Sequence, residues 1–179
     1  MIINIITLFP EIFSVLNAGL LGQAIDRKDI TINLIDLRNF ALNEYGQVDS
    51  RPYGGGEGMV LMAKPLEEAI QSIPNVHESH LVNLSPQGKQ LNQAKAQELS
   101  KYTDLTIIAG RYEGIDERII NQFVDEEISI GDFVLSGGEF AALALIDACS
   151  RFIPGVIGNQ KSVELDTFGS GLLKGPVFT

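Results

Sequence analysis

The chain is poor in cysteine and histidine, with one and two respectively among its 179 residues. The single cysteine, Cys149, excludes an internal disulfide and suits a reducing compartment, so we expect a cytoplasmic protein. Its apolar neighbours predict a buried thiol rather than a nucleophile. His77 and His80 have no cysteine or carboxylate partners at ligand spacing, which favours surface histidines over a metal site.

Long apolar runs and a basic amino-terminal region are also missing. No stretch approaches the roughly 18 apolar residues of a membrane span, and the first residues lack the features of a signal peptide, so we expect no membrane association. Basic side chains number 13 against 23 acidic ones, a net charge of −10. This balance counts against a general nucleic-acid binder, although a local basic site remains compatible with it.

Two nucleotide-binding signatures are absent as well. No G-x-G-x-x-G opens a helix after the first apolar run, and no G-x-x-x-x-G-K-[ST] occurs. The run GGGEG at residues 54–58 lacks the lysine and hydroxyl of a phosphate loop, so its composition alone predicts a flexible turn. It lies in a polar segment, residues 43–58, that is long enough to suggest a functional loop.

What is present is an alternation of strand-like and helix-like segments. Strands are expected at residues 2–8, 30–36, 81–84 and 105–109, and helices after Pro10 and at residues 20–27, 64–73, 94–100, 115–123 and 139–152. With 45% hydrophobic residues the chain can bury a core. The alternation predicts an α/β fold with a mostly parallel sheet covered by helices on both faces.

The glycine-punctuated turns at residues 110–114, 130–132 and 136–139 are the most informative feature. Glycine lets the backbone approach a ligand closely, and turns beyond the carboxyl ends of parallel strands are where open α/β sheets bind ligands. We therefore place the function in residues 109–139. Ser136 and Glu139 also match the S-x-x-E capping box before the last apolar helix.

Several charged residues have plain structural explanations. Arg118 suits a solvated helix face beside Glu113 and Asp116, and Arg151 suits the carboxyl end of an apolar helix. Asp166 lies in a Ser, Gly and Thr-rich tail, where a carboxylate can serve solubility alone. The residues by themselves thus indicate a ligand-binding α/β domain and go no further.

The chain nevertheless closely resembles the bacterial tRNA (guanine-N1)-methyltransferases, a family of SPOUT methyltransferases. The matching strings are TLFPE (residues 7–11), RPYGGG (51–56), LSPQG (84–88), GRYEGIDER (110–118), SIGD (129–132), LSGGE (135–139) and RFIPGV (151–156). The resemblance spans essentially the whole chain and implies a deep trefoil knot towards its carboxyl end.

The resemblance also implies a cofactor, a substrate and residue roles. S-adenosylmethionine is expected at Leu84, Ser85, Pro86, Gly110, Glu113, Ile130, Gly131, Asp132, Phe133, Val134, Leu135, Gly137 and Gly138. The acceptor is the guanosine on the 3′ side of the tRNA anticodon, with Asp166 as general base and Arg151 stabilising charge on the guanine. RNA contacts are expected at Arg51, Tyr53, Gly55 and Arg111. Family members are homodimers with shared active sites and depend on Mg²⁺, for which we assign no ligand.

The chain also departs from the family pattern. Ser50 replaces a second aspartate, Phe133 a tyrosine, and Phe140-Ala141 a Leu-Pro pair. The family continues into a helical tRNA-binding domain, so we expect residues 1–157 to form the knotted catalytic domain and residues 158–179 a linker tail that is disordered without RNA. With the tRNA-binding domain absent, methylation is expected to be impaired. A non-catalytic S-adenosylmethionine-binding domain is the alternative, and a flavodoxin-like nucleotide module is a more distant one.

Overall fold

The computed structural model describes residues 1–158, 167–168, 173 and 175–176. Its strands are β1 (Ile2–Thr7), β2 (Thr31–Asp36), β3 (Asp49–Ser50), β4 (Val60–Leu61), β5 (His80–Gln90), β6 (Asp104–Ile108) and β7 (Glu126–Ser129). The α-helices are α1 (Gly19–Asp26), α2 (Ala63–Gln71), α3 (Gln93–Leu99), α4 (Glu117–Phe123) and α5 (Glu139–Ser150). Short 3-10 helices are η1 (Pro10–Asn17), η2 (Leu37–Phe40) and η3 (Val76–Glu78).

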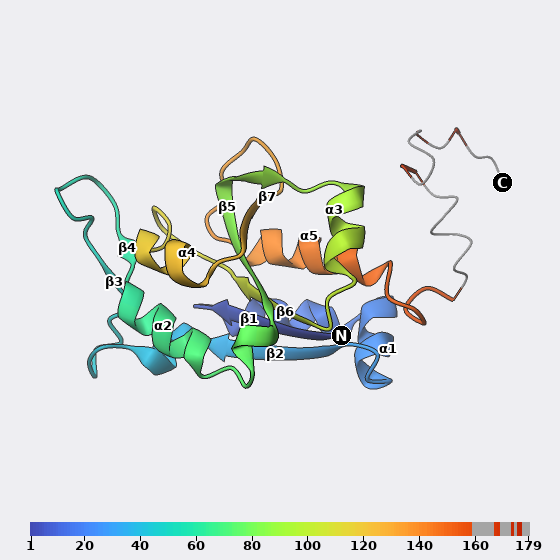
Figure 1. Cartoon of the computed structure of the whole chain (residues 1–179), viewed down its shortest axis with the longest axis horizontal. Helices are drawn as coiled ribbons and strands as arrows, with labels where there is room; N and C mark the ends of the chain where they lie inside the picture. The colour runs from blue at the N-terminus through green and yellow to red at the C-terminus, as the bar shows by residue number, and fades with distance from the viewer. Residues whose placement is uncertain (159–166, 169–172, 174, 177–179) are drawn as a thin grey trace.

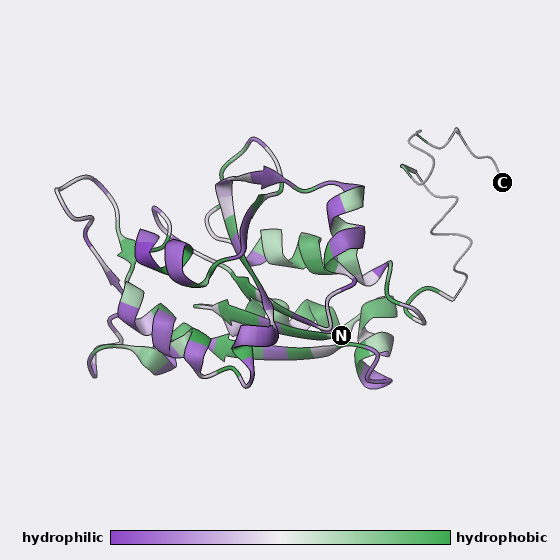
Figure 2. Ribbon diagram, in the orientation of Figure 1, coloured by the Kyte–Doolittle hydropathy of each residue, from purple (hydrophilic) through white to green (hydrophobic). Residues whose placement is uncertain are grey.

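Five of these strands form one parallel sheet in the order β2-β1-β6-β5-β7. Figure 1 shows α1 near one end of this sheet and the loop that joins β3 to β4 projecting at the other. The hydropathy colouring in Figure 2 shows apolar strands at the centre, while α2 and α3 carry both polar and apolar residues. The predicted α/β class with a parallel sheet is therefore confirmed.

Two apolar clusters cover the two faces of the sheet. One joins Ile3 and Ile5 of β1 to residues of η1, α1, α3 and α5. The other joins Ile6 of β1 to residues of η2, α2 and α4. Successive side chains of a strand point to opposite faces, so one short strand contributes to both clusters.

Helix α5 is buried on most of its surface, as its apolar sequence predicts. Cys149 lies within it with no exposed area, and burial raises the pKa of its thiol to about 12. The thiol is therefore protonated and enclosed, which confirms the buried cysteine and excludes it as a nucleophile. Within the part of the chain that the structure describes, no helix has both the length and the hydropathy needed to cross a bilayer.

The structure corrects several local predictions. Strand β7 was missed because its sequence, EEIS, has one apolar residue and does not resemble a buried strand. The strand predicted at residues 81–84 continues to Gln90 as β5, and its register against β7 shifts between Leu84 and Lys89. The 43–58 loop contains β3, which pairs with β4. The capping box is wrong, because α5 begins after Gly138 with no side-chain cap.

Candidate active site

The segments that follow β6 and β7 meet the shifted part of β5 at one edge of the sheet. They enclose a cavity of about 440 Å³. Because these strands are parallel neighbours, their carboxyl ends lie side by side, which is where an open α/β sheet binds ligands. The region singled out from glycine-rich turns therefore does surround a cavity.

Most residues predicted to bind the cofactor line this cavity. They are Leu84, Ser85, Pro86, Gly110, Glu113, Ile130, Gly131, Phe133, Val134, Leu135, Gly137 and Gly138. Asp132 is the exception: it is exposed and is not part of the lining. Of the residues predicted to contact RNA, Arg111 lines the cavity too.

Close packing of two backbone segments shapes the floor of the cavity. The Gly138 N–H donates to the Gly110 carbonyl at 2.7 Å. A methyl group on Gly138 would lie 2.9 Å from both Ala109 Cα and the Gly110 nitrogen. These are backbone atoms that cannot rotate away, so Gly138 is required for close approach of the segments rather than for an unusual φ.

Tyr112 adds backbone strain at the cavity wall. It has φ of +62°, which is uncommon for a residue with a side chain. Burial, followed by the nearby carboxylate of Asp49, raises the pKa of Tyr112. Its hydroxyl therefore stays protonated at neutral pH and remains able to donate a hydrogen bond.

The charge of the cavity lining is mainly negative. Glu113, Glu117 and Glu127 contribute carboxylates, and Arg111 contributes the only cation among the lining residues. Such a lining suits a ligand that carries positive charge.

Asn83 and Glu127 line the cavity without having been predicted. Asn83 donates its amide N–H to Glu127 at 2.8 Å. Its buried Oδ1 has no hydrogen-bond partner in the described part of the chain. Such an acceptor is costly unless a ligand or water satisfies it. A polar residue inside the apolar run LVNL was the available sequence signal.

Arg51 and Tyr53 lie elsewhere, in a second cavity of about 920 Å³ beside Lys64 and Arg118. Gly55 lines neither cavity. Ile115 and Glu117 line both cavities and so connect them. The base of the 51–58 loop is tied to the first cavity by hydrogen bonds at residues 113–114, such as Glu113 N–H to the Met59 carbonyl at 3.0 Å.

Of the two residues with predicted catalytic roles, only Arg151 belongs to the part of the chain that the structure describes. Arg151 is the C-cap of α5 and lines neither cavity. Asp166 lies outside the described residues, as does most of the tail predicted to be disordered. Arg118 has the expected exposed position, and its pairing with Asp116 lowers the pKa of that carboxyl.

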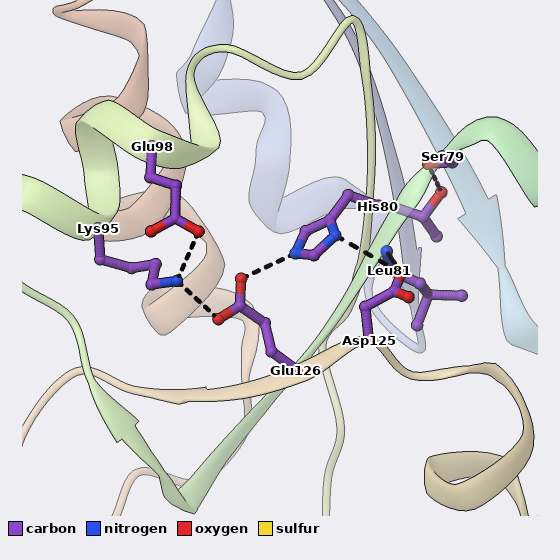
Figure 3. Close-up of polar contacts among 8 residues, drawn as sticks. Ser79, His80, Leu81, Lys95, Glu98, Asp125 and Glu126 are labelled. Atoms are coloured by element: carbon purple, nitrogen blue, oxygen red, sulfur yellow. Dashed lines mark hydrogen bonds and ion pairs between the residues drawn. The ribbon is translucent and has the colours of Figure 1, made fainter.

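The histidines are not equivalent. His77 is exposed, as predicted, but His80 is largely enclosed, which corrects the surface assignment. Its Nε2 lies 2.8 Å from Glu126, and its ring stacks on Tyr102 with centroids 4.2 Å apart. Figure 3 shows Lys95 reaching the same carboxylate from α3. The described residues contain no cluster of three or more His, Cys, Asp or Glu side chains suited to a metal ion.

The fold and the cavity together define an α/β domain of the class that has its cavity beyond the carboxyl ends of parallel strands. A family model described as "tRNA (Guanine-1)-methyltransferase TrmD" matches residues 1–179. The chain belongs to this family: it is a methyltransferase that modifies guanine N1 in tRNA with a methyl donor of the S-adenosylmethionine type.

Individual relatives agree. The chain is 51% identical to the tRNA (guanine-N(1)-)-methyltransferase of Buchnera aphidicola from Acyrthosiphon pisum, over 98% of this chain and 76% of the relative. It is 48% identical to the enzyme of Photobacterium profundum, over 99% and 72%. A crystal structure of tRNA (m1G37) methyltransferase from Aquifex aeolicus matches with TM-score 0.81 and 46% identity, covering 89% of this chain and 72% of that one.

Proposed function

We propose that the 440 Å³ cavity binds S-adenosylmethionine and that the methyl group is delivered to the guanosine at position 37, on the 3′ side of the anticodon. Its volume falls within the range of about 300 to 1,000 Å³ typical of ligand pockets. The position follows the Aquifex relative, which is a tRNA (m1G37) methyltransferase. The observation that carries the proposal is the lining, which combines nearly all the expected cofactor residues.

The chemistry of the lining supports this cofactor. S-adenosylmethionine carries a sulfonium cation, which suits the surplus of carboxylates from Glu113, Glu117 and Glu127. Its amino groups are donors of the kind that the unpartnered Oδ1 of Asn83 requires. Residues 84–86, 110, 113, 130–135, 137 and 138 would hold it, with Asp132 contributing from outside the lining.

The catalytic roles follow from the family resemblance. When bound, the cofactor supplies an electrophilic methyl group on a positively charged sulfur. Held by the residues of the cavity lining, the cofactor would supply this methyl group to guanine N1. Asp166 accepts the proton that N1 loses, and Arg151 stabilises negative charge that develops on the base.

Recognition of the RNA is proposed at Arg51, Tyr53, Gly55 and Arg111. Tyr53 is fully exposed, and bases stack on aromatic side chains of this kind. A guanosine inside the anticodon arm must leave its stack to reach the cofactor. The link between the two cavities through Ile115 and Glu117 is compatible with RNA bound at the second cavity and methylated at the first.

We further propose a homodimer whose active sites combine both subunits. Phe133, Val134 and Phe140 are more than half exposed beside the cavity, and a second copy would remove this apolar surface from water. A partner could also supply its Arg151, which does not line either cavity of its own chain. The proposal also includes the trefoil knot and the division into a catalytic domain at residues 1–157 and a linker tail at residues 158–179. It further includes Mg²⁺ dependence and a cytoplasmic location.

The test is methyl transfer to a tRNA transcript with guanosines at positions 36 and 37, beside calorimetric titration with S-adenosylmethionine. We expect saturable binding, and turnover that needs G37 and is lost in Asp166→Ala. Asp26→Ala, an exposed aspartate of α1, is the matched control and should keep activity. Binding without turnover would favour the non-catalytic alternative, and failure to bind would refute the cofactor assignment.

A further inference from the structure

The first turn of α5 contains a fully buried carboxylate that the proposed chemistry does not use. Glu139 has no exposed surface. Its Oε1 accepts from the Thr7 hydroxyl at 3.1 Å, and both of its oxygens accept from Arg111 Nε, at 3.0 and 3.1 Å. A buried charge requires partners of this kind, so the end of β1 and the turn after β6 are both joined to α5.

These contacts orient Arg111. Glu139 holds its Nε, the guanidinium lies 4.2 Å from the centre of the Phe9 ring, and the backbone forms a bridge to Gly137. Gly137 has to be glycine here, because a methyl group would lie 2.4 Å from Glu139 Oε2 and 2.6 Å from Arg111 Nε. The guanidinium is therefore restrained along one edge and one face.

The other edge of the guanidinium is available. In the part of the chain that the structure describes, the terminal nitrogens of Arg111 make no hydrogen bond. The side chain is 20% exposed and lines the cavity. An arginine held by Nε alone keeps four N–H donors in a fixed plane, which suits the acceptor atoms of guanine or phosphate.

We infer that Glu139 is a positioning residue for methyl transfer: it holds Arg111 through Nε so that the terminal nitrogens are directed to an acceptor group of the tRNA. The inference rests on the proposed function, which already includes contact between Arg111 and RNA. A purely structural Glu139 would instead act on folding, and its removal would weaken cofactor and RNA binding together.

A double-mutant cycle separates these roles. Glu139→Gln, Arg111→Lys and the double variant are compared for kcat and KM with the tRNA transcript, and for the dissociation constant of S-adenosylmethionine. Each single change should lower kcat/KM for tRNA by about 10- to 100-fold, as expected when a group is misplaced by about an ångström. The double variant should be no worse than Arg111→Lys, and cofactor affinity should change less than about twofold. Multiplicative effects, or equal losses for both ligands, would overturn the inference.

Glu126→Gln is the matched control, because it removes a carboxylate that also contacts two nitrogen-bearing side chains, His80 at 2.8 Å and Lys95 at 3.0 Å, shown in Figure 3. It should lower stability and leave kcat/KM unchanged.

NMR relaxation of the Arg111 Nε–H, assigned by its absence in Arg111→Lys, gives a readout that does not require Glu139→Gln to fold. This group should be rigid in the RNA-free wild type, and rapid averaging would contradict the inference. Absence of wild-type turnover would refute the proposed function itself.

Discussion

At the scale of single residues, the side chain of Asn83 is the most unusual group at the cavity. Its buried Oδ1 has no hydrogen-bond partner among the residues that the structure describes, while its amide N–H is bound to Glu127. We predict that Asn83→Ala weakens S-adenosylmethionine binding by about 5- to 13-fold, corresponding to one lost hydrogen bond of about 1 to 1.5 kcal/mol. Calorimetric titration measures this change.

The control for that prediction is Asn33→Ala on β2. Asn33 donates its amide to Asn4 Oδ1 at 2.9 Å and does not line the cavity. Asn33→Ala also removes an asparagine hydrogen bond, and it should leave cofactor affinity unchanged. Equal cofactor affinity in the two variants would show that Asn83 does not contact the ligand.

A second prediction at the scale of single residues concerns how the stabilisation by Glu126 depends on pH. Burial favours its neutral form, but hydrogen bonds from His80 and Lys95 outweigh burial and hold its pKa below the ordinary 4.5. Because the folded pKa is lower than the unfolded one, this stabilisation is fully present above the unfolded value and is lost as the pH falls through the folded pKa.

Glu126→Gln should therefore lower the free energy of unfolding by about 1 to 3 kcal/mol at pH 7. The difference from wild type should shrink as the pH drops below 4.5, the ordinary value for glutamate. Urea denaturation across this range tests the prediction. A difference that stays constant down to pH 3 would mean that the charge of Glu126 is not what stabilises the cluster.

At the scale of elements, the junction between α5 and the end of β6 depends on a glycine. Gly138→Ala would place a methyl group 2.9 Å from backbone atoms of Ala109 and Gly110, so the segments must separate. We expect a loss of about 1 to 3 kcal/mol in stability, as for other overpacked sites, together with weaker cofactor binding. Gly158→Ala, whose methyl group would meet none of the described residues within 4 Å, should change stability by less than about 0.5 kcal/mol. Thermal and urea unfolding of the two variants provide the comparison.

At the scale of the whole molecule, the exposed apolar surface beside the cavity predicts a dimer. Phe140 is 59% exposed at the start of α5 and does not line either cavity. Phe140→Glu should convert the protein to a folded monomer and abolish turnover, because it puts a charge into an apolar contact. Light scattering during size-exclusion chromatography measures the mass. Tyr45→Glu, at a site 96% exposed in the 43–58 loop, should remain dimeric and active.

How far the sequence predicts the site depends on whether its signals are local. The glycine-rich turns located the cavity correctly, because backbone turns with φ restrictions are encoded by neighbouring residues. Glu139 was misread as half of a capping box, since its partners Thr7 and Arg111 lie 132 and 28 positions away. His80 was assigned to the surface for the same reason: its partner Glu126 is 46 positions away.

The sequence by itself determined the α/β class, the family, and the turns that surround the cavity. Parallel strands buried on both faces are continuous apolar runs, and such runs can be recognised in the sequence alone. Only the tertiary structure decided that the polar strand β7 pairs with β5, that Asn83 and Glu127 enter the cavity wall, and that Glu139 restrains Arg111. These outcomes depend on which distant segments become neighbours, and that is set by packing of the sheet and its helices rather than by any local pattern.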